Sequence, residues 1–360
     1  MLIDSVDNRR RSIRAAGVAC LLGLALTACG GSGSSAKGGT SAGTNADGTA
    51  AAALPAAQLS LVAYSTPQDA YDQITAAFSK TPEGRNITFT KSYGASGDQS
   101  RAVESGLGAD IVAFSLEPDM TRLVKDGIVA DDWANDPYKG MITDSVVALV
   151  TRKGNPKKIT GWADLTKPGV QVITPNPFTS GGARWNVMAA YGQATRSGGA
   201  ADAGNAYLTE LFKNVAVQDG SARQALQTFT SGKGDVMIAY ENEAIFAQLK
   251  SQPIDYIVPD STILIENPVA VTKTTRFPQQ AAAFLAYLHS PAAQQIFAKN
   301  GYRPIVPGTN VGSMKFPTPK NEFTIADLGG WTDVTKRFFD PSTGIMADVE
   351  RGIGVSVGSK

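Results

Sequence analysis

The stretch VQVITPNPFTSGGARWN, residues 170 to 186, runs from an apolar strand-like segment through a proline-rich turn into a helix. The turn ends in Ser180, Gly181 and Gly182. The first backbone N–H groups of a helix have no partner inside the helix, so a turn of this kind can bind an anion. Two consecutive glycines also let an ion approach the backbone without meeting a Cβ atom.

Two further segments have the same order of strand, Gly/Ser turn and helix: NITFTKSYGASGDQSRAV at residues 86 to 103, and NVAVQDGSARQALQTF at residues 214 to 229. They add Ser96, Ser221 and Ala222 to the candidate donors. A single serine before a helix is usually an ordinary N-cap, so only the set of three turns supports a ligand site. Three such turns that converge on one point would hold one small oxyanion.

Short apolar segments alternate with amphipathic helical patterns from residue 58 onward, which predicts an α/β fold with mainly parallel sheets. A chain of 360 residues exceeds the usual size of one hydrophobic core, so we expect two lobes. Ligands of such sheets sit beyond the carboxyl ends of the strands. Strands are predicted near residues 59–64, 109–114, 146–151, 170–173, 214–217 and 235–240.

Two long β-rich stretches, ITDSVVALVTR at residues 142 to 152 and TILIENPVAVT at residues 262 to 272, flank a self-contained α/β block. They are typical of chain crossings between two lobes, with the block inserted as the second lobe. Sequential domains explain the same pattern equally well, so the residues alone leave both arrangements open.

The N-terminus is predicted to be an export signal covering residues 1 to 28. Arginines precede a short apolar run that is too short to span a membrane, and small residues follow it. Cys29, directly after this segment, resembles the lipidated cysteine of a bacterial lipoprotein lipobox. Residues 29 to 57 are mostly Gly, Ser, Ala and Thr, which predicts a flexible tether. The tri-arginine start leaves the export route open.

Cysteine, histidine and charge exclude several classes of function. Cys20 lies in the leader and Cys29 would carry lipid, so the folded part has no disulfide and no thiolate metal site. His289 is the only histidine, which argues against a multi-histidine metal site and a Ser-His-Asp triad. The formal net charge is +1 with no long basic stripe, which argues against nucleic-acid binding.

Several segments of the sequence resemble those of a known family. ITPNPFTSGGARWN, with RKGNPKKITGWADLTKPGV before it and GDVMIAYENEA after it, is similar to the bacterial sulfate/thiosulfate-binding proteins of ABC importers. SYGASGDQS resembles that family's SHGGSGKQ segment, and AKNGYRPIVP resembles its AKNFYRP. The resemblance covers about residues 59 to 331. It implies a two-lobed, type II periplasmic-binding-protein-like fold with the ligand cleft between the lobes.

On this resemblance we assign residues 58–143 plus 267–345 to the first lobe and residues 144–266 to the second. The family's sulfate contacts fall on Ser65, Ser96, Ser180, Gly181, Gly182, Ala222 and Tyr240, and the turn pattern adds Ser221. Tyr240 stands where the family has a tryptophan, and Ser65 where it commonly has aspartate. A tyrosine hydroxyl can accept as well as donate, so it would present an acceptor where the family's indole is a donor only.

The expected protein is therefore a monomeric, lipid-anchored binding protein at the extracytoplasmic face of the membrane, in the periplasm or on the cell surface. It captures sulfate or thiosulfate and delivers it to an ABC permease, with no cofactor, no metal and no catalysis. A site without a buried carboxylate would reject phosphate, because the phosphate proton would lack an acceptor. The alternatives are a binder of another oxyanion such as molybdate or phosphate, a secreted serine hydrolase using Ser96 or Ser180, and a passive adhesion lipoprotein.

Overall fold

The computed structural model describes residues 53 to 196, 200 to 355, and 357. The predicted export signal, most of the predicted tether and the predicted lipidation site at Cys29 lie outside these residues. Within the described ranges, no helix has both the length and the apolar character needed to cross a membrane.

The described strands form one sheet in the order β2-β1-β3-β9-β4-β7-β5-β6, with β8 and β10 paired to β4 and β11 paired to β9. The strands span β1 Ala57–Tyr64, β2 Ile87–Gly94, β3 Ile111–Ala113, β4 Met141–Arg152, β5 Val172–Pro175, β6 Val215–Asp219, β7 Val236–Tyr240, β8 Ile254–Ile257, β9 Ser261–Val271, β10 Arg303–Pro304 and β11 Asn321–Phe323. The helices span α1 Gln68–Phe78, α2 Ser96–Glu104, α3 Glu117–Lys125, α4 Gly181–Arg196, α5 Ala201–Lys213, α6 Ala222–Thr230, α7 Glu241–Leu249, α8 Pro278–Leu288, α9 Pro291–Lys299, α10 Gly330–Phe339 and α11 Ile345–Gly352, with short 3-10 turns at Trp162–Thr166 and Ala326–Leu328.

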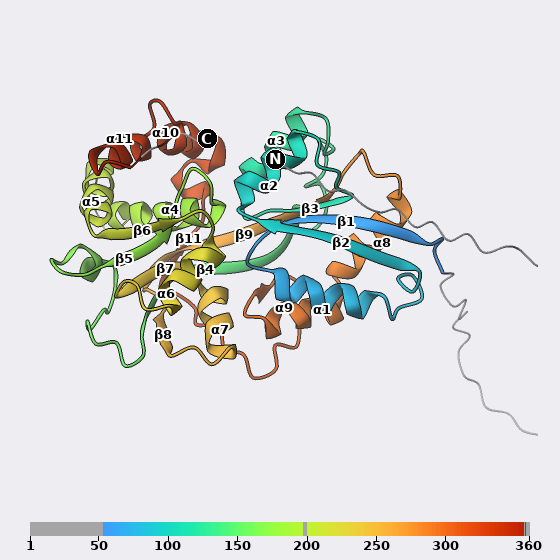
Figure 1. The fold of residues 1–360 in the computed structure, drawn as a ribbon, viewed down its shortest axis with the longest axis horizontal. Helices are drawn as coiled ribbons and strands as arrows, with labels where there is room; N and C mark the ends of the chain where they lie inside the picture. The colour runs from blue at the N-terminus through green and yellow to red at the C-terminus, as the bar shows by residue number, and fades with distance from the viewer. Residues whose placement is uncertain (1–52, 197–199, 356, 358–360) are drawn as a thin grey trace, which may run out of the picture. The chain divides into compact units, whose positions relative to one another are not determined.

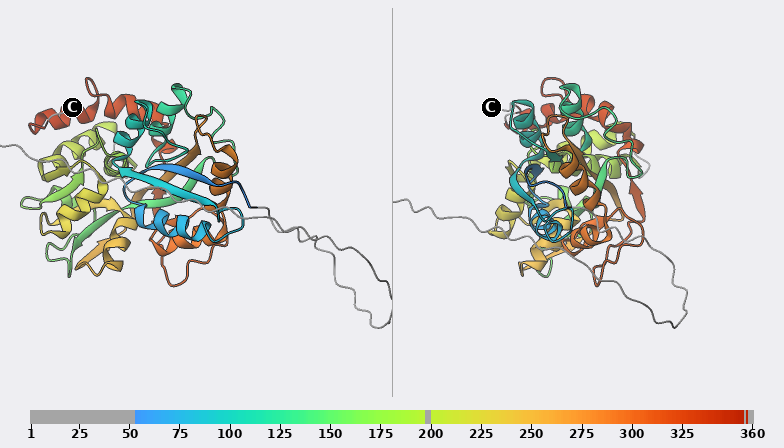
Figure 2. Two further views of the ribbon diagram at one scale, coloured as in Figure 1. Left: turned by 45° about the vertical axis from the view of Figure 1, so that its right-hand side comes forward. Right: turned by 90° about the vertical axis from the view of Figure 1, so that its right-hand side faces the viewer.

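The first group of strands, β2, β1 and β3, is parallel and lies between two helical layers. Figures 1 and 2 show α1 and α9 on one face of these strands and α2 and α3 on the other. Side chains alternate between the two faces as the period of a strand requires. Leu61 and Ala63 of β1 therefore belong to one apolar core, and Val62 between them belongs to another. We call this group with its helices the first lobe.

The second group, β7, β5 and β6, is also parallel and has two cores of its own. Leu149 and Val172 face one core, while their neighbours Val150 and Ile173 face the other. Figure 1 shows α4 and α5 over one side of these strands and α6 and α7 over the other. We call this group with its helices the second lobe. The α/β fold class predicted from the sequence is confirmed.

Strands β4 and β9 join the two lobes as an antiparallel pair. The first half of β4 pairs with β9, and its second half pairs with β7. Strand β9 in turn reaches β3 with residues Val269 to Val271. The two stretches that the sequence marked as crossings are therefore paired strands that belong to both lobes.

The C-terminal helices α10 and α11 pack on the second lobe. Trp331 of α10 meets Trp185 of α4 edge to face, with ring centroids 4.7 Å apart, and Phe338 and Met346 lie in the same apolar core. The lobe boundaries stay a prediction. We propose one change in them: residues 321 to 345 belong with the second lobe, because their buried side chains contact its core.

Gly192 of α4 gives a test of this packing. A Cβ atom at Gly192 would lie 2.3 Å from the ring of Phe323 in β11. Gly192→Ala should therefore lower the free energy of unfolding. Overpacking costs about 1–3 kcal/mol, and a contact this short belongs at the upper end, so after the roughly 1 kcal/mol that alanine gains inside a helix the net loss should be up to about 2 kcal/mol. Urea denaturation measures the change.

Gly108→Ala is the matched control, because a Cβ atom there meets no other atom within 4 Å. If the two substituted proteins had the same free energy of unfolding, the proposed packing of the C-terminal segment against α4 would be contradicted.

Candidate functional site

One small pocket collects the ends of strands and the starts of helices from both lobes. Strands β1, β2, β6 and β7 end beside it, and helices α2, α4 and α6 begin there. The pocket is small, with a cavity volume of about 10 Å³. Its lining residues are Tyr64, Ser65, Thr66, Ala95, Ser96, Ser115, Ser180, Gly181, Gly182, Ala222 and Tyr240.

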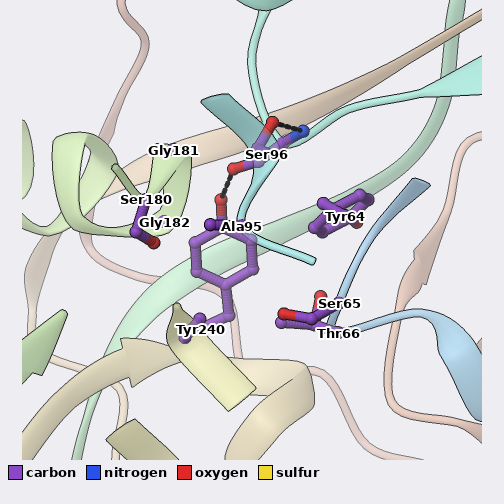
Figure 3. A pocket seen from close by; sticks show the side chains of 11 residues that line it. Tyr64, Ser65, Thr66, Ala95, Ser96, Ser180, Gly181, Gly182 and Tyr240 are labelled. Atoms are coloured by element: carbon purple, nitrogen blue, oxygen red, sulfur yellow. Dashed lines mark hydrogen bonds between the residues drawn. The ribbon is translucent and has the colours of Figure 1, made fainter. Parts of the chain in front are cut away.

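The structure brings together seven of the eight residues that the sequence predicted for the site. Figure 3 shows the Tyr240 side chain extending across the pocket, with Ser180 and Gly182 on one side and Ser65 and Thr66 on the other. Ser221 does not line the pocket. Its hydroxyl instead accepts a hydrogen bond from the backbone N–H of Gln224, at 3.3 Å, as the N-cap of α6.

The pocket is also lined by four residues that the turn pattern did not indicate: Tyr64, Thr66, Ala95 and Ser115. Ser115 follows a strand and precedes a helix, as Ser96 does, but its turn contains no glycine. Tyr64 ends β1 one residue before the predicted Ser65. Position at the carboxyl end of a strand was therefore a usable signal for both residues.

Backbone amides are the main donors that the pocket offers. The amides that open α4, at Gly181 and Gly182, and those that open α2, at Ser96, lie in the first turn and cannot bond inside their own helices. A Cβ atom on Gly182 would sit among Ala222, Ser180 and Tyr240, at 3.3 to 3.5 Å, so it would project into the pocket. Glycine keeps that approach to the backbone open.

The Ser96 hydroxyl is already committed to protein partners. It donates to a carboxylate oxygen of Asp119 at 2.6 Å and accepts from the backbone N–H of Ser115 at 2.9 Å. A hydroxyl has one proton, so in this arrangement Ser96 offers the pocket its backbone N–H rather than its side chain. Asp119 is buried and also faces Arg122, at 3.3 Å.

No carboxylate lines the pocket, but a buried one lies close behind it. The Asp119 carboxylate stands behind the pocket, one hydroxyl away from it, although it does not line the wall. No charged side chain is among the lining residues. The polar groups of the pocket wall are therefore backbone dipoles and hydroxyl groups, set among the apolar parts of alanine and tyrosine side chains.

Tyr240 crosses from the second lobe to the first. Its hydroxyl lies 2.5 Å from the hydroxyl of Ser115, and either oxygen can be the donor. Burial raises the pKa of Tyr240 well above its usual value, with the nearby Tyr64 adding to the shift. The phenol therefore stays neutral at physiological pH and keeps its proton for a hydrogen bond.

His289 and the ion-paired side chains do not line the pocket. The His289 ring stacks on Tyr138, with centroids 4.5 Å apart, and contacts the backbone oxygen of Met141 at 3.0 Å. Over the described ranges, no group of three or more His, Cys, Asp or Glu side chains is placed to hold a metal ion. The chemistry that this pocket supports is the binding of a small group that accepts hydrogen bonds.

Comparisons with known proteins agree with this geometry. A family model described as bacterial extracellular solute-binding protein matches residues 59–303. A sulfate-binding protein of Synechococcus elongatus is 41% identical, over 92% of this chain and 94% of its own length. A thiosulfate-binding protein of Pseudomonas aeruginosa is 35% identical, over 83% of this chain and 93% of its own length.

A solved structure, the sulfate-binding protein SubI from Mycobacterium tuberculosis H37Rv, superposes with a TM-score of 0.76 at 42% identity. The match covers 79% of this chain and 99% of that one. The predicted type II periplasmic-binding-protein fold is thereby confirmed.

The buried tyrosines predict a loss of stability at alkaline pH. Tyr240 and Tyr71 both have raised pKa values in the folded state because they are buried. In the unfolded chain they lose a proton near pH ~10, so above that pH the folded state binds more protons than the unfolded state. The free energy of unfolding is then expected to fall by up to about 1.4 kcal/mol per pH unit for each such tyrosine.

Tyr240→Phe removes one of these groups and should flatten the fall by about that amount. Tyr71→Phe, outside the pocket, should flatten it equally, which identifies burial as the cause. Urea denaturation from about pH 8 to about pH 11 measures the slope. A slope that neither substitution changes would contradict the assignment.

Proposed function

The chain belongs to the bacterial extracellular solute-binding proteins, in the group that includes sulfate- and thiosulfate-binding proteins, and we propose that it binds sulfate or thiosulfate for an ABC importer. The observation that carries this proposal is the pocket itself. Helix starts from two lobes converge on a space without charged side chains, and that arrangement suits a small, fully ionised oxyanion.

The available donors are strong enough for useful affinity. A partly buried helix start contributes up to about 2 kcal/mol toward an anion, and a hydrogen bond to a charged group contributes about 1.5–3 kcal/mol. Several such terms exceed the desolvation cost and reach the roughly −8 kcal/mol of micromolar binding. The proposed ligand contacts are Ser65, Ser96, Ser180, Gly181, Gly182, Ala222 and Tyr240, with Ser221 holding the start of α6 in place.

The wall of the pocket favours sulfate over phosphate. Sulfate has no proton at neutral pH, whereas phosphate usually keeps one and needs an acceptor for it. The Asp119 carboxylate already accepts from the Ser96 hydroxyl and is not among the lining residues. This supports rejection of phosphate, because no carboxylate lines the pocket to accept the phosphate proton.

A second candidate ligand is another tetrahedral oxyanion, molybdate or phosphate. The paired hydroxyls of Ser115 and Tyr240 favour it, since a hydroxyl can accept the proton that a carboxylate otherwise would. A serine hydrolase is disfavoured, because His289 is held by Tyr138 and Met141 and does not line the pocket. We infer a binding protein without catalytic activity.

The proposal extends to where the protein works. Its family is extracellular, so we propose export through the leader at residues 1 to 28. We further propose lipidation of Cys29, a tether to residue 57, and a monomer that presents the bound anion to the permease. The sequence of the leader and tether supports these steps.

Calorimetric titration tests the ligand. The purified protein, stripped of bound anion, should bind sulfate with micromolar or tighter affinity and give no heat with phosphate. Gly182→Asp should abolish the sulfate heat, because it places a side chain and a negative charge in the pocket, and like charges cost several kcal/mol.

Gly108→Asp is the control, because a side chain at residue 108 projects into open space. It should bind sulfate like the unsubstituted protein. Phosphate affinity equal to that for sulfate would favour the second candidate, and sulfate binding retained in Gly182→Asp would refute the site.

The lipid anchor has a separate test. When the full gene is expressed in a bacterial host, the protein should partition into the detergent phase of Triton X-114, and Cys29→Ser should move it to the aqueous phase. Cys20→Ser, in the apolar run of the leader, is the matched control and should partition like the unsubstituted protein. Equal partition of all three proteins would contradict lipidation at Cys29.

A further inference from the structure

Ser115 lines the pocket and makes hydrogen bonds to both lobes and to one of the strands that join them. It lies in the loop between β3 and α3 of the first lobe, and only 1% of its surface is exposed. Its backbone N–H donates to the hydroxyl of Ser96 at 2.9 Å. This bond fixes Ser115 against the start of α2, inside its own lobe.

The remaining polar atoms of Ser115 face the other lobe and the crossing strands. Its backbone oxygen accepts from the indole N–H of Trp185 at 2.8 Å and from the side-chain amide of Asn267 at 3.0 Å. Its hydroxyl pairs with Tyr240 at 2.5 Å. Trp185 and Tyr240 belong to the second lobe, and Asn267 lies on β9, which joins the two.

The two lobes also touch sterically at Ser115. A Cβ atom on Gly181 would lie 2.8 Å from both the Cβ and the hydroxyl oxygen of Ser115. Only a glycine allows the start of α4 to come this close to the loop. Ser115 therefore meets the second lobe through two hydrogen bonds and one contact surface, all beside the pocket.

We propose that Ser115 is a positioning residue of the anion site, which holds the two lobes at their closed spacing and aims the hydroxyl of Tyr240 into the pocket. The inference rests on the proposed function, since it concerns the same pocket. It adds a residue and a role that the turn pattern did not indicate.

The hydroxyl pair explains how the positioning works. Two hydroxyls that share one hydrogen bond use one of their two protons, so the other proton is left to donate to an anion. Without Ser115 the buried Tyr240 hydroxyl keeps only its hydrogen bond with Asn267 of the joining strand β9, and closure gains one hydrogen bond fewer. The effect should appear when the lobes are closed on a ligand, and thus mainly in the dissociation rate.

The test is a double-mutant cycle on sulfate binding. Ser115→Ala should weaken affinity about 3- to 10-fold, the range expected for one lost hydrogen bond, through faster dissociation. Tyr240→Phe should weaken it in the unsubstituted background but have little further effect in the Ser115→Ala background. This coupling is the readout that a general loss of stability would not produce.

Ser145→Ala is the matched control. Ser145 is as buried as Ser115, and its hydroxyl has no hydrogen-bond partner among the described residues. It should leave affinity unchanged. Unchanged affinity in Ser115→Ala, or fully additive effects of the two substitutions, would overturn this inference while sulfate binding stands. Absence of sulfate binding in the unsubstituted protein would overturn the proposed function and this inference together.

Discussion

Unpaired backbone N–H groups at three helix starts are the constraint on which the rest of the pocket depends. Helices α2, α4 and α6 each begin at the carboxyl end of a strand, and their first amides must find a partner outside the helix. Burying such donors without an acceptor costs free energy, so closing the lobes over an empty pocket is unfavourable. In the proposed function, an oxyanion would supply acceptors to those of the amides that line the pocket, and binding would thereby be coupled to closure.

The two lobes can approach closely because glycines lie at the starts of α2 and α4. A Cβ atom on Gly181 would meet Ser115 and Leu116, and one on Gly97 would lie 2.9 Å from the backbone oxygen of Thr179. Each of these contacts joins one lobe to the other. Gly181, whose amide we propose as a ligand contact, is therefore also a residue that lets the lobes meet, so one glycine would serve both binding and closure.

The sequence predicted what is local and missed what depends on tertiary contacts. Strand, turn and helix follow one another within 20 residues or so, and this pattern identified Ser96, Gly181 and Ala222. The sequence pattern did not indicate Ser115, because its partner Tyr240 lies 125 residues away and its turn has no glycine. The packing of α10 on α4 was not predicted for a similar reason, because the pattern of an amphipathic helix does not specify which apolar surface covers it.

The charged side chains nearest the pocket do not line it but lie directly behind the residues that do. Asp119 lies behind Ser96 and pairs with Arg122, while Arg223 of α6 pairs with the buried Glu243 and donates to the backbone oxygen of Thr66 in the first lobe. A full positive charge in the wall would attract many anions and be costly to bury alone. The dipoles of helix starts would instead stabilise an anion only where their N–H groups point, because the effect of a helix dipole falls off within the first turn. In the proposed function, selectivity would then depend on the spacing of the two lobes, which gives a residue such as Ser115 a role beside those that would touch the ion.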